Sequence, residues 1–138
     1  IEAGLREVDR GRWQALEVAE LHRRHPEEVA AFHADPWTFR GHGGESDSDV
    51  AARAWPLLER EARAHPGAAL VFVCHYNVIR CLCSVALGLP PPRSFALRLD
   101  KARALLLEDR PAGFKLVALN LHDPGAFTAR DEHLGAVR

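Results

Sequence analysis

The sequence predicts an α/β fold in which helices pack against a sheet with an antiparallel edge. Two observations carry this prediction. Segments with helical periodicity alternate with short apolar segments up to residue 88, and a run of strand-like segments with a turn follows. Helices that alternate with strands and then give way to a run of strands are typical of an α/β sheet with an antiparallel edge.

The N-terminal part of the chain is expected to be extended first and helical afterwards. Residues 5–13 form a turn-prone segment in which Gly11 is free to adopt a positive φ. A helix is predicted over residues 16–24, before Pro26, and a second helical stretch over residues 27–33.

A longer amphipathic helix is predicted from Val50 to about Ala64. Its apolar residues, spaced to share one helical face, are Val50, Ala54, Leu57, Leu58 and Ala62. Ser46 or Asp47 can cap this helix, and Asp49 favours its first turn. Pro56 is expected to bend the helix, because it removes one backbone hydrogen bond.

The central prediction is a strand, a sharp turn and a helix over residues 70–88. Residues 70–74 form a continuous apolar run of strand length, which is typical of a strand buried on both faces. Helical spacing begins at Val78 and ends at Gly88. His75 lies where the strand ends, beside the helix N-terminus, and α/β proteins bind anions at such positions. Two interpretations of His75 stay open here, a polar residue leaving the core and a contact to an anionic ligand.

Strands are predicted for the C-terminal part of the chain. Residues 95–99 alternate as a strand would, and residues 102–107 and 114–119 are two further candidate strands. Residues 109–113 separate the last two strands as a hairpin turn. No firm structure is predicted for residues 121–138.

Length and composition indicate one soluble domain. The chain has 138 residues, of which 18 are basic and 19 acidic. Its net charge of −1 gives no excess of positive charge that would favour binding to nucleic acid or to an anionic membrane. No apolar run approaches a membrane span, and a cytoplasmic location is expected. The three cysteines are expected to be reduced rather than paired. No metal site is expected, because Cys81 and Cys83 would point about 200° apart on a helix.

Three motifs in order resemble the histidine phosphatase superfamily, the phosphoglycerate mutase-like proteins. They are L-R-E-V-D-R-G-R-W at residues 5–13, G-E-S at residues 44–46, and V-F-V-C-H-Y-N-V-I-R at residues 71–80. The segment F-K-L-V-A-L-N-L-H-D-P at residues 114–124 is similar to the family's last strand. The resemblance covers the C-terminal two thirds of such a domain. It implies a three-layer α/β/α sandwich with a mainly parallel central sheet and an antiparallel edge.

This resemblance implies phosphoryl transfer through a phosphohistidine. In the family a histidine attacks phosphorus, a carboxylic acid protonates the leaving oxygen, and a second histidine stabilises the phosphoryl oxygens. Glu7 matches the acid, and His75 matches the second histidine. Ser46, Tyr76 and Asn77 are the further phosphate-binding candidates, with simple packing as the alternative for Tyr76. No cofactor is implied.

The family's nucleophile motif, Arg-His-Gly, does not occur in the sequence. Residues 40–43 contain the same residue types in another order, and His42 is not expected to be the nucleophile. Arg53 and Arg80 are expected to be structural ion-pair partners rather than phosphate ligands. We therefore expect residues 1–138 to be a single, N-terminally incomplete domain of this type that lacks its first strand or strands and is inactive by itself.

The function predicted from these residues is that of a phosphomonoester hydrolase acting on a small phosphorylated substrate. A non-catalytic domain that binds or scaffolds a phosphorylated ligand is the alternative, and phosphoglycerate mutase activity is a third reading. The expected protein partner is a second copy of the chain or the N-terminal segment that would carry the nucleophile.

Overall fold

The structure, a computed structural model, describes residues 1–111 and 113–122. In this part of the chain the elements are, in order, η1 (Ala3–Leu5), η2 (Gly11–Trp13), α1 (Val18–Arg24), α2 (Pro26–Ala34), α3 (Asp47–Ala64), α4 (Tyr76–Ala86), η3 (Pro91–Ala96), β1 (Ala104–Arg110) and β2 (Gly113–Leu121), where η marks a 3-10 helix.

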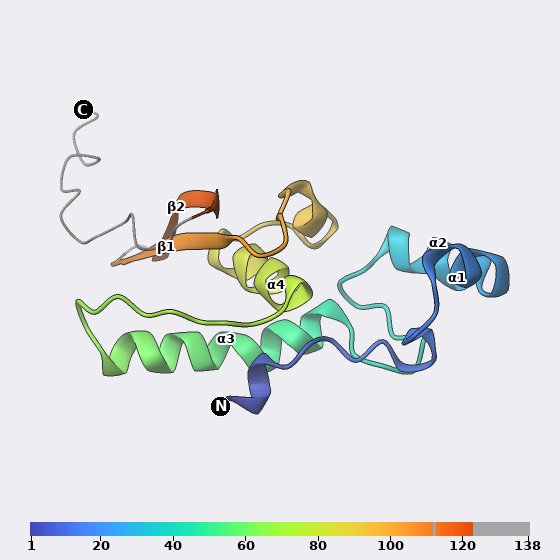
Figure 1. Cartoon of the computed structure of the whole chain (residues 1–138), viewed down its shortest axis with the longest axis horizontal. Helices are drawn as coiled ribbons and strands as arrows, with labels where there is room; N and C mark the ends of the chain where they lie inside the picture. Colours follow the sequence, from blue (N-terminus) through green and yellow to red (C-terminus); the bar gives the residue numbers. More distant parts are fainter. Residues whose placement is uncertain (112, 123–138) are drawn as a thin grey trace.

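The long helix α3 forms the base of the molecule. Figure 1 shows residues 65–75 running back along α3, with α4 and the β1–β2 hairpin beyond that segment. Helix α4 packs against α3, and strand β2 contacts α4. Helices α1 and α2 form a separate pair at the end of the molecule where α3 begins (Figure 1).

Helix α3 confirms the predicted amphipathic helix, and a capping box fixes its first turn. The Ser46 hydroxyl accepts a hydrogen bond from the Asp49 amide, and the Asp49 carboxylate accepts one from the Ser46 amide (2.9 Å). Pro56 lies inside the helix, as predicted. The helix begins three residues before Val50, because the cap and the first turn carry polar residues that the apolar pattern does not include.

The hydrophobic core lies mainly between α3 and α4. Its buried residues are Val8, Val50, Ala51, Ala54, Leu58, Val78, Cys81 and Leu82. Val50, Ala54 and Val78 are completely enclosed. Val8 brings the N-terminal segment into the same core, and this contact positions the residue before it, Glu7.

The strand predicted over residues 70–74 is absent from the described part of the chain. No strand is assigned to these residues and no strand pairs with them; the segment runs along α3 (Figure 1). Phe72 and Cys74 pack against the core, whereas Val71 and Val73 are 80% and 88% exposed. The prediction of burial on both faces is therefore wrong, since no described residue covers the outer face of the segment.

The predicted C-terminal hairpin is confirmed, but the strand predicted over residues 95–99 is wrong. Strands β1 and β2 pair antiparallel with a register shift between Ala104 and Leu107. Residues 95 and 96 belong to η3, and residues 97–99 lie outside any strand. The expectation for residues 121–138 falls mostly outside the described residues.

The only sheet among the described residues is this two-stranded antiparallel one. The mainly parallel central sheet and the three layers of the predicted sandwich are therefore not found in this part of the chain. Helices α1 and α2 agree with the predicted helices to within two residues at each end. None of the helices in the described part is long and apolar enough to cross a membrane.

A pair of valine variants tests the assignment of the core. We expect Val50→Ala to lower the free energy of unfolding by about 1–3 kcal/mol, because two enclosed methyl groups leave a cavity. Val18→Ala, at a position that is 72% exposed, should change it by less than about 0.5 kcal/mol. Urea unfolding followed by circular dichroism measures both. Equal effects of the two variants would contradict the described core.

Candidate active site

His75 lies directly before helix α4 and is exposed. It is the N-cap residue, its backbone is extended (φ −106°, ψ 160°), and no side chain caps the first turn of the helix. The first amides of a helix have no acceptor within the helix and carry partial positive charge. The imidazole of His75 and the N-terminus of α4 together form a polar surface suited to an anion.

Tyr76 and Asn77 form the start of this helix. The side chain of Tyr76 is partly open to solvent. The Asn77 Oδ1 atom accepts a hydrogen bond from Arg80 Nη2 (3.4 Å). This contact uses the carboxamide oxygen and leaves the amino group of Asn77 as a donor. Asn77 can therefore donate a hydrogen bond to a ligand near the helix N-terminus.

Glu7 lies in the extended segment between η1 and η2 and is half-buried. Its Oε1 atom accepts a hydrogen bond from the Val8 amide (2.8 Å). Burial raises the pKa of Cys74, and the negative charge of Glu7 adds to this rise while the His75 amide opposes it. Val8, the next residue in the chain, belongs to the same core cluster as Val78, and Cys74 packs against that cluster.

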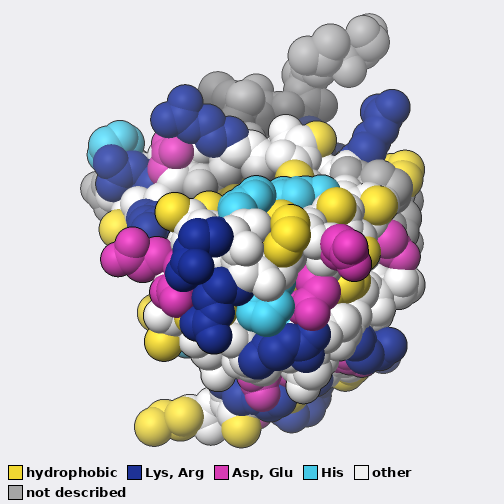
Figure 2. All heavy atoms as spheres, turned by 90° about the vertical axis from the view of Figure 1, so that its right-hand side faces the viewer, with side chains coloured by type: hydrophobic (Ala, Val, Ile, Leu, Met, Phe, Trp, Pro, Cys, Tyr) yellow, Lys and Arg dark blue, Asp and Glu magenta, His cyan; other side chains and the backbone are white. Residues whose placement is uncertain are grey.

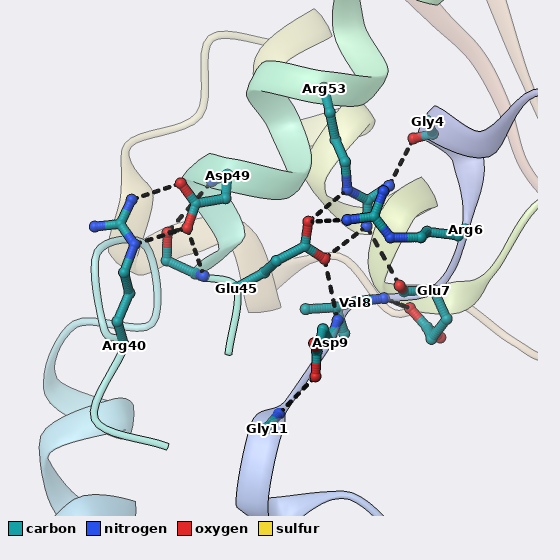
Figure 3. A network of polar contacts seen from close by, with 11 residues as sticks. Gly4, Arg6, Glu7, Val8, Asp9, Gly11, Arg40, Glu45, Asp49 and Arg53 are labelled. Atoms are coloured by element: carbon teal, nitrogen blue, oxygen red, sulfur yellow. Dashed lines mark hydrogen bonds and ion pairs between the residues drawn. The ribbon is translucent and has the colours of Figure 1, made fainter. Parts of the chain in front are cut away.

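An ion pair between Glu45 and Arg53 holds the Glu7 segment against helix α3 (Figure 3). Arg53 donates from Nε and Nη2 to the two oxygens of the Glu45 carboxylate, at 2.8 Å and 3.0 Å. The same guanidinium donates to the carbonyl oxygens of Gly4 (2.6 Å) and Glu7 (3.3 Å). The Asp9 amide donates to the second Glu45 oxygen (3.1 Å). Arg53 therefore has a structural role, as predicted.

The electrostatics of Glu45 agree with this role. Burial alone would raise the pKa of Glu45, but hydrogen bonds from Arg53 and the Asp9 amide outweigh burial, and the pKa is lowered. Arg6 also contacts the carboxylate, at 2.8 Å (Figure 3). Glu45 is thus held as a carboxylate between two arginines.

Two glycines allow the first two motifs to interlock. Gly11 has a φ of +52°, and a Cβ atom there would lie 2.3 Å from the His42 carbonyl oxygen. A Cβ atom on Gly44 would lie 2.2 Å from the Asp9 carbonyl oxygen. The backbones are joined by hydrogen bonds from Glu45 N to Asp9 O (2.7 Å) and from Arg12 N to His42 O (3.1 Å). Only glycine permits such a close approach.

The Ser46 side chain serves the helix cap and does not face solvent. It is completely buried, and its hydroxyl contacts Ser48 Oγ and Asp49 Oδ2, both at 2.8 Å. The capping role expected of this residue is therefore confirmed. The further expectation of a ligand contact has no support in this geometry.

A buried charge cluster, formed by Arg10, Asp47 and Arg80, connects the N-terminal segment, α3 and α4. The Asp47 carboxylate lies 3.1 Å from Arg10 Nη2 and 2.7 Å from Arg80 Nη2. The side chains of Asp47 and Arg80 are fully buried, and that of Arg10 is 17% exposed. Arg80 therefore has the structural role predicted for it.

Sequence reasoning identified Asp47 only as a cap and did not identify Arg10 at all. A signal for Asp47 was present. It lies three, seven and eleven residues before Val50, Ala54 and Leu58, which places it on the apolar face of the helix. A carboxylate on a buried face requires a cationic partner, and this requirement predicts an arginine from another element.

His42 is enclosed and cannot reach a substrate. It is 1% exposed and packs with the rings of Trp13 and Phe39, at centroid distances of 4.9 Å and 5.3 Å. Its Nδ1 atom accepts a hydrogen bond from the Gly44 amide (2.9 Å). Burial, followed by the positive charges of Arg10 and Arg12, lowers the pKa of His42. This environment agrees with the expectation that His42 is not a nucleophile.

The cysteines lie within the packed part of the molecule. Burial raises the pKa of Cys81 and of Cys83 to about 12, so both are protonated thiols at neutral pH. All three cysteines are free. Among the described residues, no group of three or more His, Cys, Asp or Glu side chains could hold a metal ion.

Comparison with known proteins decides the family. The model of the histidine phosphatase superfamily (branch 1) matches residues 1–122. The chain belongs to this family. Within it, the fructose-2,6-bisphosphatase of Saccharomyces cerevisiae is 25% identical over 93% of this chain and 28% of its own length. The glucosyl-3-phosphoglycerate phosphatase of Mycobacterium tuberculosis is 36% identical over 65% of this chain and 44% of its own length. The chain thus spans less than half the length of these curated relatives.

Solved structures show that this histidine phosphatase-family chain has a phosphoglycerate mutase-like fold. Mycobacterial glucosyl-3-phosphoglycerate phosphatase in complex with VO3 matches with a TM-score of 0.76 and 30% identity, over 87% of this chain and 63% of the other. The α-ribazole phosphatase of Shigella flexneri matches with a TM-score of 0.73 and 20% identity, over 88% of this chain and 60% of the other. The second likeness concerns the fold alone.

The enclosure of His42 predicts a pH dependence of stability. The folded-state pKa lies below the ordinary value of 6.5, so the unfolded chain binds more protons as the pH falls through 6.5. We therefore expect the free energy of unfolding to decrease as the pH decreases through this window. The contribution of His42 to this slope is at most about 1.4 kcal/mol per pH unit. Urea unfolding between pH 7.5 and 5.5 measures the slope.

The variant His42→Gln should have a flatter slope than the unmodified chain, because it removes the group that takes up the proton. His33→Gln, at an exposed histidine, is the matched control. Identical slopes for His42→Gln and the unmodified chain would show that His42 does not titrate in this way.

Proposed function

We propose that this protein is a phosphomonoester hydrolase of the histidine phosphatase type, and that the residues around His75 bind the phosphoryl group. One observation supports the proposal above the others. In a chain of this family, the exposed His75 lies at the N-terminus of α4, where no side chain caps the helix. Arg53 holds the Glu7 carbonyl, and the next residue, Val8, shares a core cluster with Val78 of α4.

The phosphoryl group binds through donors that are already in place. His75 donates from its imidazole, while the amides of Tyr76 and Asn77 and the Asn77 amino group lie at the start of α4. Donors fixed before the reaction stabilise the charge that develops on phosphoryl oxygens, and they need no reorganisation during the step. Tyr76 adds a ring at the border of this surface.

Glu7 acts as the general acid of the first step. A histidine nitrogen forms a bond to phosphorus, the bond from phosphorus to the ester oxygen breaks, and Glu7 gives its proton to that oxygen. Water then attacks the phosphohistidine, with Glu7 now accepting a proton, and phosphate leaves. The contacts that fix the carbonyls of Gly4 and Glu7 to Arg53 keep this acid in position.

The attacking histidine of this mechanism is not identified among residues 1–138. The sequence has no Arg-His-Gly motif, and His42 is enclosed. Val71 and Val73 expose apolar side chains along the segment that leads to His75. We propose that a strand carrying the nucleophile pairs along this segment and completes one domain with residues 1–138.

The relatives support a proposal for the substrate class. Their names specify glucosyl-3-phosphoglycerate and fructose 2,6-bisphosphate, which are small phosphorylated compounds, and one related structure was solved with inorganic phosphate. We propose a small phosphorylated substrate for this chain as well. A mutase that moves a phosphoryl group between two positions would use the same residues.

A non-catalytic phosphate-binding domain is the second candidate. The observation that favours it is that the given sequence contains the candidate acid Glu7 and the candidate phosphate ligand His75 but no Arg-His-Gly motif. This candidate shares the binding surface at His75 and differs only in the chemical step.

Phosphate binding at His75 is tested by titrating the 138-residue chain with inorganic phosphate. Amide signals of Tyr76 and Asn77 in the 1H–15N NMR spectrum should shift in a saturable way. We expect His75→Ala to weaken binding about tenfold or more, because a charge-assisted hydrogen bond is lost. His65→Ala, at an exposed histidine beyond α3, should leave binding unchanged. If phosphate shifts only amide signals away from Tyr76 and Asn77, the proposal is contradicted.

The catalytic and the non-catalytic candidates separate when imidazole in solution replaces the missing nucleophile. With imidazole the chain should release phenol from phenyl phosphate and form N-phosphoimidazole, whereas without imidazole it should release none above the blank. We expect Glu7→Gln to lower this rate about a hundredfold. The loss should be smaller with p-nitrophenyl phosphate, whose leaving group needs no proton. A rate equal to that of imidazole alone would favour the non-catalytic candidate.

A further inference from the structure

His42 joins the first two motifs through both its backbone and its ring. Its carbonyl oxygen accepts a hydrogen bond from the Arg12 amide (3.1 Å), and its Nδ1 atom accepts one from the Gly44 amide (2.9 Å). The ring is 1% exposed and lies against Trp13 and Phe39. One buried side chain therefore connects the segment of η2 to the turn that precedes α3.

The contact to Gly44 fixes the protonation state of the His42 imidazole. A backbone amide can only donate, so Nδ1 must keep its lone pair, and the proton of the neutral ring lies on Nε2. The buried Nε2 atom has no hydrogen-bond partner among residues 1–111 and 113–122. A second proton would enter at Nδ1, where it would face the N–H of Gly44. Protonation of His42 is therefore incompatible with this hydrogen bond.

Charges of both signs surround His42. Arg10 and Arg12 lower its pKa. Asp9, from the same segment, and Glu28, from α2, raise it. Figure 2 looks onto the end of the molecule that carries α1 and α2, and it shows basic and acidic side chains beside one another on the surface. These opposing charges partly offset one another, and burial is the largest cause of the lowered pKa.

Gly44 is linked to Glu7 through Glu45 and Arg53 (Figure 3). Glu45 donates its amide to the Asp9 carbonyl (2.7 Å), and its carboxylate holds Arg53. Arg53 in turn donates to the Glu7 carbonyl (3.3 Å). The packing leaves little room for a shift, because a Cβ atom on Gly44 would lie 2.2 Å from the Asp9 carbonyl oxygen. A displacement of Gly44 therefore disturbs the contacts that fix Glu7.

We propose that His42 is a positioning residue for Glu7, and that proton uptake by its imidazole separates the turn of residues 42–45 from residues 7–11. The proton comes from solvent and binds at Nδ1, the hydrogen bond from the Gly44 amide is lost, and the ring moves toward water. Glu45 then no longer holds Arg53 against the Glu7 carbonyl. The opening itself goes beyond the proposed function, whereas its effect on catalysis rests on the role proposed there for Glu7.

The opening is expected below pH 6.5. In the packed turn the pKa of His42 lies below its ordinary value of 6.5, whereas in an open turn the imidazole regains that value. The open form therefore binds more protons, and its population rises as the pH decreases through 6.5. The apparent midpoint of the titration must lie between the two pKa values, and so below 6.5.

NMR spectra of the 138-residue chain between about pH 7.5 and pH 5 test the opening. At pH 7.5 the ring of His42 should carry its proton on Nε2, and on acidification it should titrate with a midpoint below 6.5. The amide signals of Gly44, Glu45 and Val8 should shift with the same midpoint. Val8 reports on the acid, because its amide donates to the Glu7 carboxylate. A proton on Nδ1 at pH 7.5 would overturn the proposal, as would amides that do not follow His42 or the absence of any His42 titration in this range.

A variant that keeps the acceptor but cannot be protonated separates charge from packing. His42→Asn places its side-chain oxygen near the position of Nδ1, so the Gly44 amide keeps a partner. The amides of Glu45 and Val8 should then stay at their neutral-pH positions down to about pH 5.5. His65→Asn, at an exposed histidine beyond α3, should behave as the unmodified chain does. Shifts below pH 6.5 that persist in His42→Asn would overturn the proposal. The spectra of the unmodified chain decide the question by themselves where His42→Asn does not fold.

The effect on catalysis is measured with imidazole as the nucleophile and phenyl phosphate as the substrate. The titration of imidazole cancels in the ratio of the rate of the unmodified chain to the rate of His42→Asn. We expect this ratio to fall by about threefold or more from pH 7.5 to pH 5.5. A constant ratio in the presence of the amide shifts would overturn the positioning role of His42. The absence of any chain-dependent rate would contradict the proposed function, while the NMR spectra would still decide whether the turn opens.

Discussion

The ion pair between Glu45 and Arg53 is the interaction on which the position of Glu7 depends. The segment that contains Glu7 has no helix or strand to fix it, so its backbone carbonyls need donors from elsewhere. Arg53 supplies these donors, and Glu45 holds Arg53 in place from the turn before α3. Close contact between the two backbones is possible because Gly11 and Gly44 carry no side chain. Two motifs separated by more than thirty residues thus act as one structural unit.

The second link joins this unit to the helix that follows His75. Asp47, at the start of α3, contacts Arg10 from the N-terminal segment and Arg80 from α4. Charged side chains are costly to bury, but a buried carboxylate with two arginines fixes their relative positions over short distances. Helix α4 begins directly after His75, so the position of Arg80 also sets where the uncapped amides point. The candidate acid and the candidate anion site are therefore held by neighbouring parts of α3.

Sequence patterns correctly predicted the helices, whose hydrogen bonds and caps lie within one segment of the chain. They failed for the strand, whose hydrogen bonds require a second segment. Helix α3 followed from the spacing of its apolar residues and from the cap at Ser46. The strand predicted over residues 70–74 failed because strands require a neighbouring strand, and the described residues provide none. The motifs predicted Glu7 and His75 as site candidates, but nothing in either motif indicated that Arg10 would pair with Asp47. The helical spacing of Asp47 indicates that it needs a cationic partner, but it does not say which arginine, because that contact forms only after the segments have come together.

The central claim is that one phosphate site lies between Glu7 and the N-terminus of α4. A crystal structure of the chain with vanadate bound would test this claim most directly, since a related phosphatase was solved with VO3. The account predicts vanadium oxygens within hydrogen-bonding distance of the His75 imidazole and the amides of Tyr76 and Asn77, with the Glu7 carboxylate facing the same ion. Vanadate bound elsewhere, with His75 and α4 making no contact to it, would contradict the account.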